Sequence, residues 1–284
     1  MAESNGARAD GTPGSAAAPA RSGEPTLRMT GVSKAFGAVQ ALRDVDFEVW
    51  SGEVVGLVGD NGAGKSTLIK IIAGVNPADT GHIFMDGKEV HISAPTDANR
   101  LGIETVYQDL ALADNLDVVA NLYLGREGVA PPIPGLGGVL SETEMEVRTL
   151  DVLRQLDVKT IKSVRVPVAA LSGGQRQSIA VAKTILRRAK VVLLDEPTAA
   201  LGVAQTRQVL HLIRRLRANG LAVVVISHNL ADIFEVVDRV IVLRLGQRVG
   251  SYDIASTTPE KVVAAITGAE FGATTPADLP INGK

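Results

Sequence analysis

The sequence contains no cysteine, so disulfide bonds, thiolate catalysis and cysteine-ligated metal sites are all excluded. Aromatic residues make up only 3% of the 284 residues, which argues against an aromatic stacking platform for single-stranded nucleic acid. The formal net charge is −2, so no broad basic field would attract nucleic acid or anionic lipid. No apolar run approaches the roughly 20 residues that span a bilayer. We therefore expect an intracellular protein that does not cross a membrane and binds no nucleic acid.

Both ends of the chain have the composition of disordered segments. Residues 1–24 are rich in Ala, Gly, Ser and Pro and lack the apolar stretch of a signal peptide, so they are interpreted as a disordered leader. Residues 271–284 have a similar composition and are interpreted as a flexible tail. The remainder, 25–270, is long enough for one domain with a sizeable core, and no internal repeat divides it.

Apolar runs that alternate with helical patterns predict an α/β core with a parallel sheet. Residues 191–194 and 222–226 are almost continuously apolar, as is typical of strands buried on both faces. A helix is expected between them at 204–218, ending at Asn219-Gly220. The other predicted elements are two strands within 27–49, strands at 53–58 and 240–243, a helix at 66–73, and a hairpin at 81–92 around Asp86-Gly87.

The middle of the chain has a different pattern. Residues 95–170 are mainly helical in pattern, apart from a Pro/Gly-rich stretch at 128–138 that is expected to be a surface loop. Ser141 and Glu144 have the spacing of a capping box, which would open a helix that runs to about Leu156. We therefore predict a helical subdomain at about 99–164, inserted between core segments at about 25–98 and 165–250.

A glycine-rich loop at 59–66 fits the spacing G-x-x-x-x-G-K-[ST]. Its glycines let backbone N–H groups point at phosphate oxygens, beside the positive end of the following helix. Lys65 would reach the β- and γ-phosphates, and the Ser66 hydroxyl would ligate Mg²⁺. The expected nucleotide contacts here are Gly59, Asn61, Gly62, Ala63, Gly64, Lys65, Ser66 and Thr67. Chance would produce the pattern in roughly one per cent of such chains, but this copy also lies between an apolar strand and an apolar helix.

The apolar strand at 191–194 is followed by two acids, Asp195 and Glu196. A parallel sheet places the carboxyl ends of its strands at the ligand crevice. Asp195 would hold Mg²⁺ through its water shell, and Glu196 would polarise the attacking water as a general base. A strand that ends in Asp-Glu is by itself often a solvated turn. Its combination with the phosphate loop favours the functional interpretation.

A second loop with the chemistry of an anion site precedes a predicted helix in the later half of the chain. It consists of Ser172, Gly173, Gly174 and Gln175 after Leu171. A Ser-Gly-Gly turn alone is common. Two loops with the chemistry of phosphate sites, together with a single acid pair at a strand end, are uncommon in one chain. With these motifs the chain resembles the nucleotide-binding subunits of ATP-binding-cassette transporters, from about residue 27 to 245.

That resemblance implies a P-loop NTPase fold, with a RecA-like parallel-sheet core, an antiparallel β subdomain and an inserted α-helical subdomain. It also implies an ATPase that uses ATP and Mg²⁺. In the family, the phosphate loop of one subunit faces the serine-glycine loop of the other across ATP. The resemblance therefore implies a homodimer in which residues 172–175 complete the partner's site.

Three further roles are implied by the resemblance. Gln108 matches the glutamine that touches Mg²⁺ and water, and His228 matches the histidine that contacts the γ-phosphate; Phe36 matches the aromatic residue that stacks on adenine. Each has an ordinary alternative on local sequence alone: an exposed loop glutamine, a satisfied core histidine and a core aromatic. One position departs from the family, because Gly202 stands where an aspartate that couples the two sites is usual.

Residues 102–108 and 120–126 are similar to the ATP-binding subunits of bacterial simple-sugar importers of the ribose, xylose and fructose type. This similarity implies a transmembrane permease as direct partner and an extracytoplasmic sugar-binding protein as an indirect one. The chain would then sit peripherally on the cytoplasmic face of the bacterial inner membrane. Leu110, Leu112 and Leu116 are candidates to line a groove for the permease, with ordinary core packing as the alternative.

Two other functions stay open from the sequence. One is a soluble cassette ATPase that acts on DNA, ribosomes or Fe–S assembly, against which the near-neutral charge and scarce aromatics count. The other is a nucleotide-gated scaffold with weak turnover, which Gly202 leaves possible.

Overall fold

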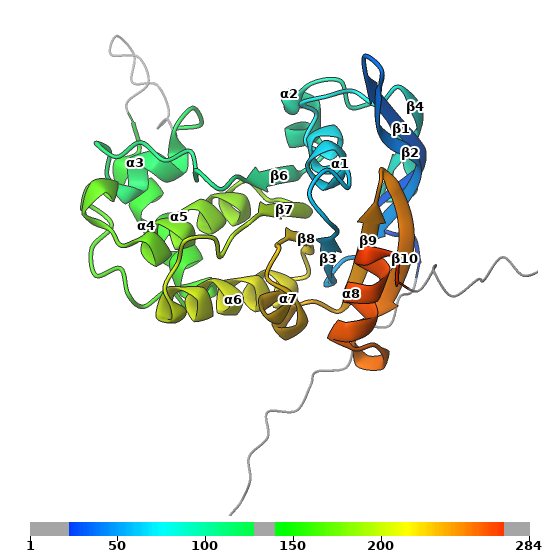
Figure 1. The fold of residues 1–284 in the computed structure, drawn as a ribbon. Helices are drawn as coiled ribbons and strands as arrows, with labels where there is room; N and C mark the ends of the chain where they lie inside the picture. The colour runs from blue at the N-terminus through cyan, green and yellow to red at the C-terminus, as the bar shows by residue number, and fades with distance from the viewer. Residues whose placement is uncertain (1–22, 128–139, 270–284) are drawn as a thin grey trace, which may run out of the picture.

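The structure is a computed structural model that describes residues 23–127 and 140–269 (Figure 1). All but the last two residues of the expected leader, the whole expected tail and the expected loop at 128–138 lie outside these ranges. None of the helices in the described ranges has the length and apolar character needed to traverse a bilayer.

A six-stranded sheet in the order β10-β9-β3-β8-β7-β6 forms the centre of the described chain. Its strands run parallel except for β10, which pairs antiparallel with β9 at one edge. They are β3 (Val54–Val58), β6 (Ile103–Val106), β7 (Val191–Asp195), β8 (Ala222–Ile226), β9 (Arg239–Arg244) and β10 (Gln247–Asp253). The parallel sheet predicted from the apolar runs is confirmed.

A second, antiparallel sheet has the order β2-β1-β4-β5. Its strands are β1 (Leu27–Phe36), β2 (Val39–Val49), β4 (Thr80–Met85) and β5 (Lys88–Val90). The hairpin predicted around Asp86 and Gly87 is confirmed, and both turn residues have positive φ, 49° and 75°. This sheet lies on the opposite side of the central sheet from α3, α4 and α5 (Figure 1).

Helices cover the central sheet and form the insert. They are α1 (Lys65–Ile72), α2 (Pro95–Arg100), α3 (Val118–Tyr123), α4 (Glu142–Gln155), α5 (Gly173–Leu186), α6 (Val203–Ala218), α7 (Leu230–Val236) and α8 (Pro259–Thr267), with short 3₁₀ turns at Val168–Ala170 and Ile254–Ser256. The predicted helix at 204–218 is confirmed as α6, and Gly220 after it has a φ of 79°.

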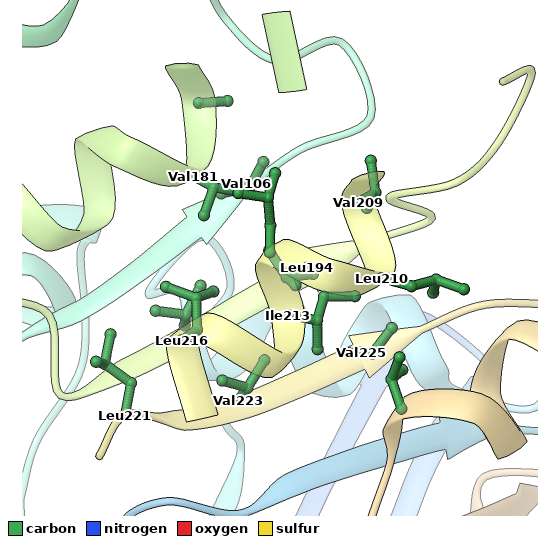
Figure 2. Close-up of a cluster of buried hydrophobic side chains, with 14 of the residues drawn as sticks. Val106, Val181, Leu194, Val209, Leu210, Ile213, Leu216, Leu221, Val223 and Val225 are labelled. Carbon is green, nitrogen blue, oxygen red and sulfur yellow. The ribbon is translucent and has the colours of Figure 1, made fainter. Parts of the chain in front are cut away.

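The central sheet separates two apolar clusters, because successive residues of a strand point to opposite faces. Val192 and Leu194 of β7 belong to the cluster that includes Leu216 of α6 (Figure 2). Val191 and Leu193 belong to the cluster formed with α1 and the antiparallel sheet. Burial on both faces explains why these strands are apolar at consecutive positions.

The sequence prediction is wrong at 103–106, where the helical pattern of the middle region gives way to strand β6. Glu104 within it is only 6% exposed. The Arg187 guanidinium, 2.9 Å from its carboxylate, compensates the charge that this burial takes out of water. That partner is 83 residues away in the chain, so the local pattern could not predict the burial. The predictions also omitted β10 and α8, although Thr258, Pro259 and Gly268 bound α8 with ordinary start and stop signals.

The predicted helix after Ser141 is confirmed as α4, but the predicted capping box is not formed. Ser141 makes no side-chain bond to the backbone of the helix, and its Oγ lies 3.3 Å from Glu144 Oε2 instead. A capping box is found at α5, where Ser172 and Gln175 bond each other's backbone N–H groups.

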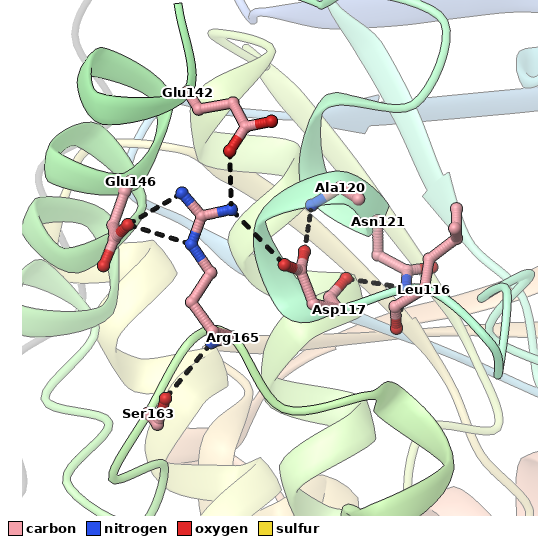
Figure 3. Close-up of polar contacts among 8 residues, drawn as sticks. All are labelled: Leu116, Asp117, Ala120, Asn121, Glu142, Glu146, Ser163 and Arg165. Atoms are coloured by element: carbon pink, nitrogen blue, oxygen red, sulfur yellow. Dashed lines mark hydrogen bonds and ion pairs between the residues drawn. The ribbon is translucent and has the colours of Figure 1, made fainter.

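Arg165 connects three segments of the helical insert (Figure 3). Its guanidinium lies 3.5 Å from Asp117, the N-cap of α3, and 3.3 and 2.8 Å from Glu142 and Glu146 of α4. The Arg165 side chain is 40% exposed, so solvent screens these pairs and they orient the helices more than they stabilise them.

Asn121 is the more consequential polar residue of the insert. It is 1% exposed, and its amide nitrogen donates to the carbonyls of Ala113, Leu116 and Asp117 while its oxygen accepts from the Ala113 N–H. These bonds hold the turn before α3 in place.

Asn121→Ala should lower the free energy of unfolding by about 2–3 kcal/mol, because it removes four side-chain hydrogen bonds and leaves the partly buried Ala113 N–H without its acceptor. Urea unfolding followed by circular dichroism measures the change. Leu124→Ala, at the exposed end of the same helix, is the control and should change stability by less than about 1 kcal/mol. Equal stability of both variants would contradict the assigned role of Asn121.

Candidate functional site

The candidate site lies where four parallel strands end. Pairing aligns Leu57 of β3 and Asp195 of β7 with Ile226 of β8, and it aligns Val106 of β6 with Leu194. The segments that follow these strands therefore emerge at one edge of the sheet, as the parallel arrangement predicts. They carry the phosphate loop, Gln108, the acid pair and His228.

The phosphate loop has a conformation that only glycine tolerates at its ends. Gly59 has a φ of 153°, and a Cβ there would lie 2.2 Å from the Leu243 carbonyl oxygen. Gly64 has a φ of 103°, and a Cβ there would lie 2.7 Å from Leu42 and 2.8 Å from the Ala41 carbonyl oxygen. The backbone is therefore packed too closely for any side chain at these two positions.

Lys65 folds back over this loop. Its Nζ donates to the carbonyl oxygens of Gly59 at 2.7 Å and Asp60 at 3.0 Å. Burial lowers the pKa of Lys65, and the nearby charges of Glu196, Asp60 and Asp195 oppose that shift. The Lys65 ammonium thus lies inside the phosphate loop, near acids at the ends of the parallel strands.

The remaining residues of the predicted loop take two positions. Asn61 and Gly62 lie at its exposed tip, whereas Ala63 is buried. Ser66 and Thr67 lie in the first turn of α1, and Ser66 is exposed. The Ser66 hydroxyl is therefore accessible to a ligand at the helix N-terminus, where the helix dipole favours an anion.

Asp195 is the last residue of β7, and Glu196 follows in a left-handed conformation with a φ of 48°. The Glu196 N–H donates to the Ile226 carbonyl at 2.9 Å, which fixes the turn. Burial raises the pKa of Asp195, and the adjacent Glu196 carboxylate raises it further; Lys70 and Lys65 oppose this. The charged form of Asp195 is therefore disfavoured in this structure, and a nearby cation would favour it.

His228 is brought to Glu196 from the end of β8. Its Nδ1 lies 2.9 Å from Glu196 Oε2, and its backbone N–H donates to the same oxygen at 3.4 Å. The His228 side chain is 79% exposed, so it is not a packed core histidine. Nothing in the sequence predicted this pair, since the two residues are 32 positions apart.

A second contact that the sequence did not predict supports the same turn. The Thr198 hydroxyl donates to Asp232 Oδ2 at 2.7 Å, which joins the segment after Glu196 to α7. Thr198 lies two residues after Glu196 in the run Asp-Glu-Pro-Thr, and this closeness to the acid pair was the only hint in the sequence that it supports the turn.

Gln108 and Phe36 are both on the surface, and their assigned roles stay predictions. Gln108 lies two residues after β6 and is exposed. Phe36, at the end of β1, is 47% exposed, and the Lys34 ammonium lies 5.6 Å from its ring centroid. Phe36 is therefore not a core aromatic.

The serine-glycine loop at 172–175 lies at the start of α5, beside α6. Ser172 is the N-cap of α5, and Gln175 Nε2 donates to the Thr160 carbonyl at 2.8 Å. A Cβ on Gly173 or Gly174 would meet residues 201, 205 and 208 around the start of α6, not the phosphate loop. Gly202 is the exposed N-cap of α6 beside it.

The ends of the parallel strands offer oxygen donors that could bind Mg²⁺ together with the phosphates of a nucleoside triphosphate. No group of three or more His, Cys, Asp or Glu side chains is arranged for a metal in residues 23–127 and 140–269. Mg²⁺ is usually bound by one or two protein oxygens together with phosphate oxygens and water. Ser66, Asp195 and Gln108 carry side-chain oxygens of this kind.

Comparison with known proteins gives an independent result. Residues 42–199 match the family described as ABC transporter. The chain is 44% identical over 248 residues to the fructose import ATP-binding protein of Rhizobium meliloti, an alignment that covers 87% of this chain and 95% of that protein. It is also 44% identical over 246 residues to the xylose/arabinose import ATP-binding protein of Sulfolobus acidocaldarius, with the same coverage.

A solved structure shares the fold. It is the dimeric post-hydrolysis state of an ATP-binding cassette bound to ADP and Pi, with a TM-score of 0.65 and 25% identity over 80% of this chain and 98% of that one.

Proposed function

The chain belongs to the ABC transporter family, and from this we propose that it binds and hydrolyses ATP to drive monosaccharide uptake through a separate membrane permease. The observation that carries the proposal is the convergence of Lys65, Asp195 and Glu196 at the strand ends in a chain 44% identical to a fructose import ATP-binding protein. The same alignment covers 95% of that relative.

Nucleotide binding would use the phosphate loop and the residues around it. Backbone N–H groups of 59–66 and the start of α1 would surround the β- and γ-phosphates. Lys65 would exchange its bonds to the Gly59 and Asp60 carbonyls for bonds to phosphate oxygens. Exposed Phe36 would stack on the adenine.

Hydrolysis would depend on Glu196. Its carboxylate would take a proton from water as the water oxygen bonds to the γ-phosphorus and the bond from phosphorus to ADP breaks. His228, 2.9 Å from Glu196 Oε2, would hold this carboxylate in position, and Gln108 would contact the water from the end of β6. Mg²⁺, held through Ser66, Asp195 and Gln108, would neutralise charge on the phosphate oxygens.

Two copies would act together. The loop at 172–175 packs beside the start of α6, and the nearest neighbours of Gly173 and Gly174 do not include residues 59–66. A second copy could present this loop to that nucleotide, with Ser172, Gly173, Gly174 and Gln175 at the positive end of α5. The dimeric structure of a related cassette supports this arrangement.

The chain would lie on the cytoplasmic face of the bacterial inner membrane, held there by the permease, while an extracytoplasmic protein delivers the sugar. Leu110 and Leu112 are partly buried against the core cluster, and Leu110 also lines a cavity beside β6. Leu116 is half-buried, and its carbonyl accepts from Asn121. Leu110 therefore remains the best candidate of the three for contact with the permease.

Deletion of the gene for this chain in the source organism should abolish uptake of at least one labelled monosaccharide among fructose, xylose, arabinose and ribose. Wild-type chain should restore uptake, because the permease alone lacks an energy source. Glu196→Gln should not restore it, whereas the exposed control Glu24→Gln should. Uptake of all four sugars at wild-type rates in the deletion strain would contradict the import proposal.

A further inference from the structure

A cavity of about 220 Å³ lies between the segment that follows α4 and the helices α5 and α6. Its lining consists of residues 157–160, Ser178 of α5, and Arg207, Gln208, His211 and Leu212 of α6. None of these residues belongs to the phosphate loop or to the acid pair. The cavity is therefore distinct from the candidate nucleotide site.

The surface inside this cavity is mainly apolar. Leu212 is 2% exposed, and Val158 packs against the apolar cluster to which Leu212 belongs. A dry apolar cavity of about 150 Å³ can bind benzene, so this cavity has room for a ligand body of at least that size. An apolar body is the complement of such a lining.

The lining also carries more positive than negative charge, since Lys159 and Arg207 are accompanied by a single acid, Asp157. The Asp157 carboxylate lies 2.8 Å from Lys159 Nζ and 3.3 Å from His211 Nε2. The hydrogen bond from Lys159 and its charge hold the pKa of Asp157 below its usual range, and His211 adds to this effect. The exposed Arg207 guanidinium forms no hydrogen bond or ion pair within residues 23–127 and 140–269. Arg207 is thus a cation for which the cavity supplies no free acid.

Three residues of the lining also contact the serine-glycine loop. The Thr160 carbonyl accepts from Gln175 Nε2 at 2.8 Å, and Ser178 Oγ donates to the Gly174 carbonyl at 2.9 Å. A Cβ on Gly174 would lie 2.8 Å from Gln208 Oε1, so Gln208 packs directly against the backbone of the loop. A ligand that immobilises these walls would therefore also immobilise the loop.

We propose that this cavity binds a small carboxylate with an apolar body, and that the bound carboxylate raises ATP turnover through the loop at 172–175. The apolar body would lie on Val158 and Leu212, and the carboxylate would accept charge-assisted hydrogen bonds from Arg207. The effect on turnover rests on the proposed function, in which this loop completes the partner's nucleotide site, whereas the binding itself does not. A loop that is ordered before two copies meet lowers the entropy cost of closing on ATP.

Three small probes test the two requirements for binding on the full chain. Benzoate has both a ring and a carboxylate, benzyl alcohol lacks the charge, and acetate lacks the ring. Titration calorimetry should give a Kd for benzoate at least about 10-fold below that of either other probe. Equal binding of benzoate and acetate would reduce the cavity to an anion site, and equal binding of benzoate and benzyl alcohol would reduce it to an apolar one. Either result would overturn the inference.

Arg207→Gln tests the position of the carboxylate. It should weaken benzoate binding by about 10-fold or more and leave the Tm unchanged, because the side chain is exposed and has no partner to lose. Arg248→Gln makes the same change at an exposed position of β10, across the central sheet from α5 (Figure 1), and should leave the Kd within about 2-fold. An unchanged Kd for benzoate in Arg207→Gln would remove Arg207 from the site.

Phosphate release with and without saturating benzoate tests the effect on the loop. Turnover of the wild type should rise by about 2-fold or more, whereas Arg207→Gln should keep the basal rate at the same benzoate concentration. Binding of benzoate with unchanged turnover would overturn the coupling to the loop. Failure of benzoate to bind a chain that hydrolyses ATP would overturn the inference and leave the proposed function standing. A chain that binds benzoate through Arg207 but hydrolyses no ATP would overturn the proposed function and support the binding site.

Discussion

Glu196→Gln should lower ATP hydrolysis by about 10²-fold or more while ATP still binds. The amide cannot accept a proton from water, yet it has the shape of the carboxylate and can still accept the bond from the His228 N–H. The nucleotide contacts at 59–66 are unchanged, so two copies should close on ATP and remain closed. Single-turnover phosphate release measures the rate, and size-exclusion chromatography with ATP measures the dimer.

Glu24→Gln is the matched control for this experiment. It makes the same chemical change at an exposed position far from the strand ends in the sequence, and it should leave the rate within about 2-fold. Turnover of Glu196→Gln at the wild-type rate would remove Glu196 from the role of general base. A normal rate constant with weakened ATP binding would instead place Glu196 in the binding step.

The site could be predicted from the sequence because its parts follow strands that are themselves predictable. The apolar runs of β7 and β8 identify buried parallel strands, and parallel pairing brings their ends to one edge. The position of Asp195 therefore follows from a rule about sheets, whereas His228 was singled out only through the family resemblance. The motif spacing of 59–66 adds the loop, whose tight packing at Gly59 and Gly64 agrees with the glycines found there.

What the sequence could not predict depends on partners far away in the chain. Strand β6 contains a buried Glu104 that is satisfied only by Arg187, and the same arginine lines the cavity beside β6. The capping box illustrates the same limit, because the spacing at Ser141 and at Ser172 is alike and only Ser172 caps its helix. Local spacing permits such bonds, but tertiary packing decides which of them form.

Lys65→Ala should weaken the binding of Mg·ATP by about 10- to 100-fold, as expected for the loss of a charge-assisted hydrogen bond to phosphate. The loss should be larger for ATP than for AMP, because Lys65 is expected to reach only the β- and γ-phosphates. Titration calorimetry with each nucleotide at one Mg²⁺ concentration measures the difference. Lys162→Ala, an exposed lysine of the insert, is the control and should bind both as the wild type does.

The comparison of ATP with AMP also separates two ways in which Lys65→Ala could act. Lys65 holds the Gly59 and Asp60 carbonyls in this structure, so its removal could simply loosen the loop. The loop backbone and the start of α1 are expected to contact the α-phosphate too, so a loosened loop would weaken the binding of AMP as well as ATP, whereas a lost Lys65 contact would weaken ATP alone. Equal affinity of Lys65→Ala and wild type for ATP would contradict the assignment of residues 59–66 as the phosphate loop. A selective loss for ATP would place the Lys65 ammonium on the terminal phosphates, where Asp195 and Glu196 also lie within its electrostatic reach.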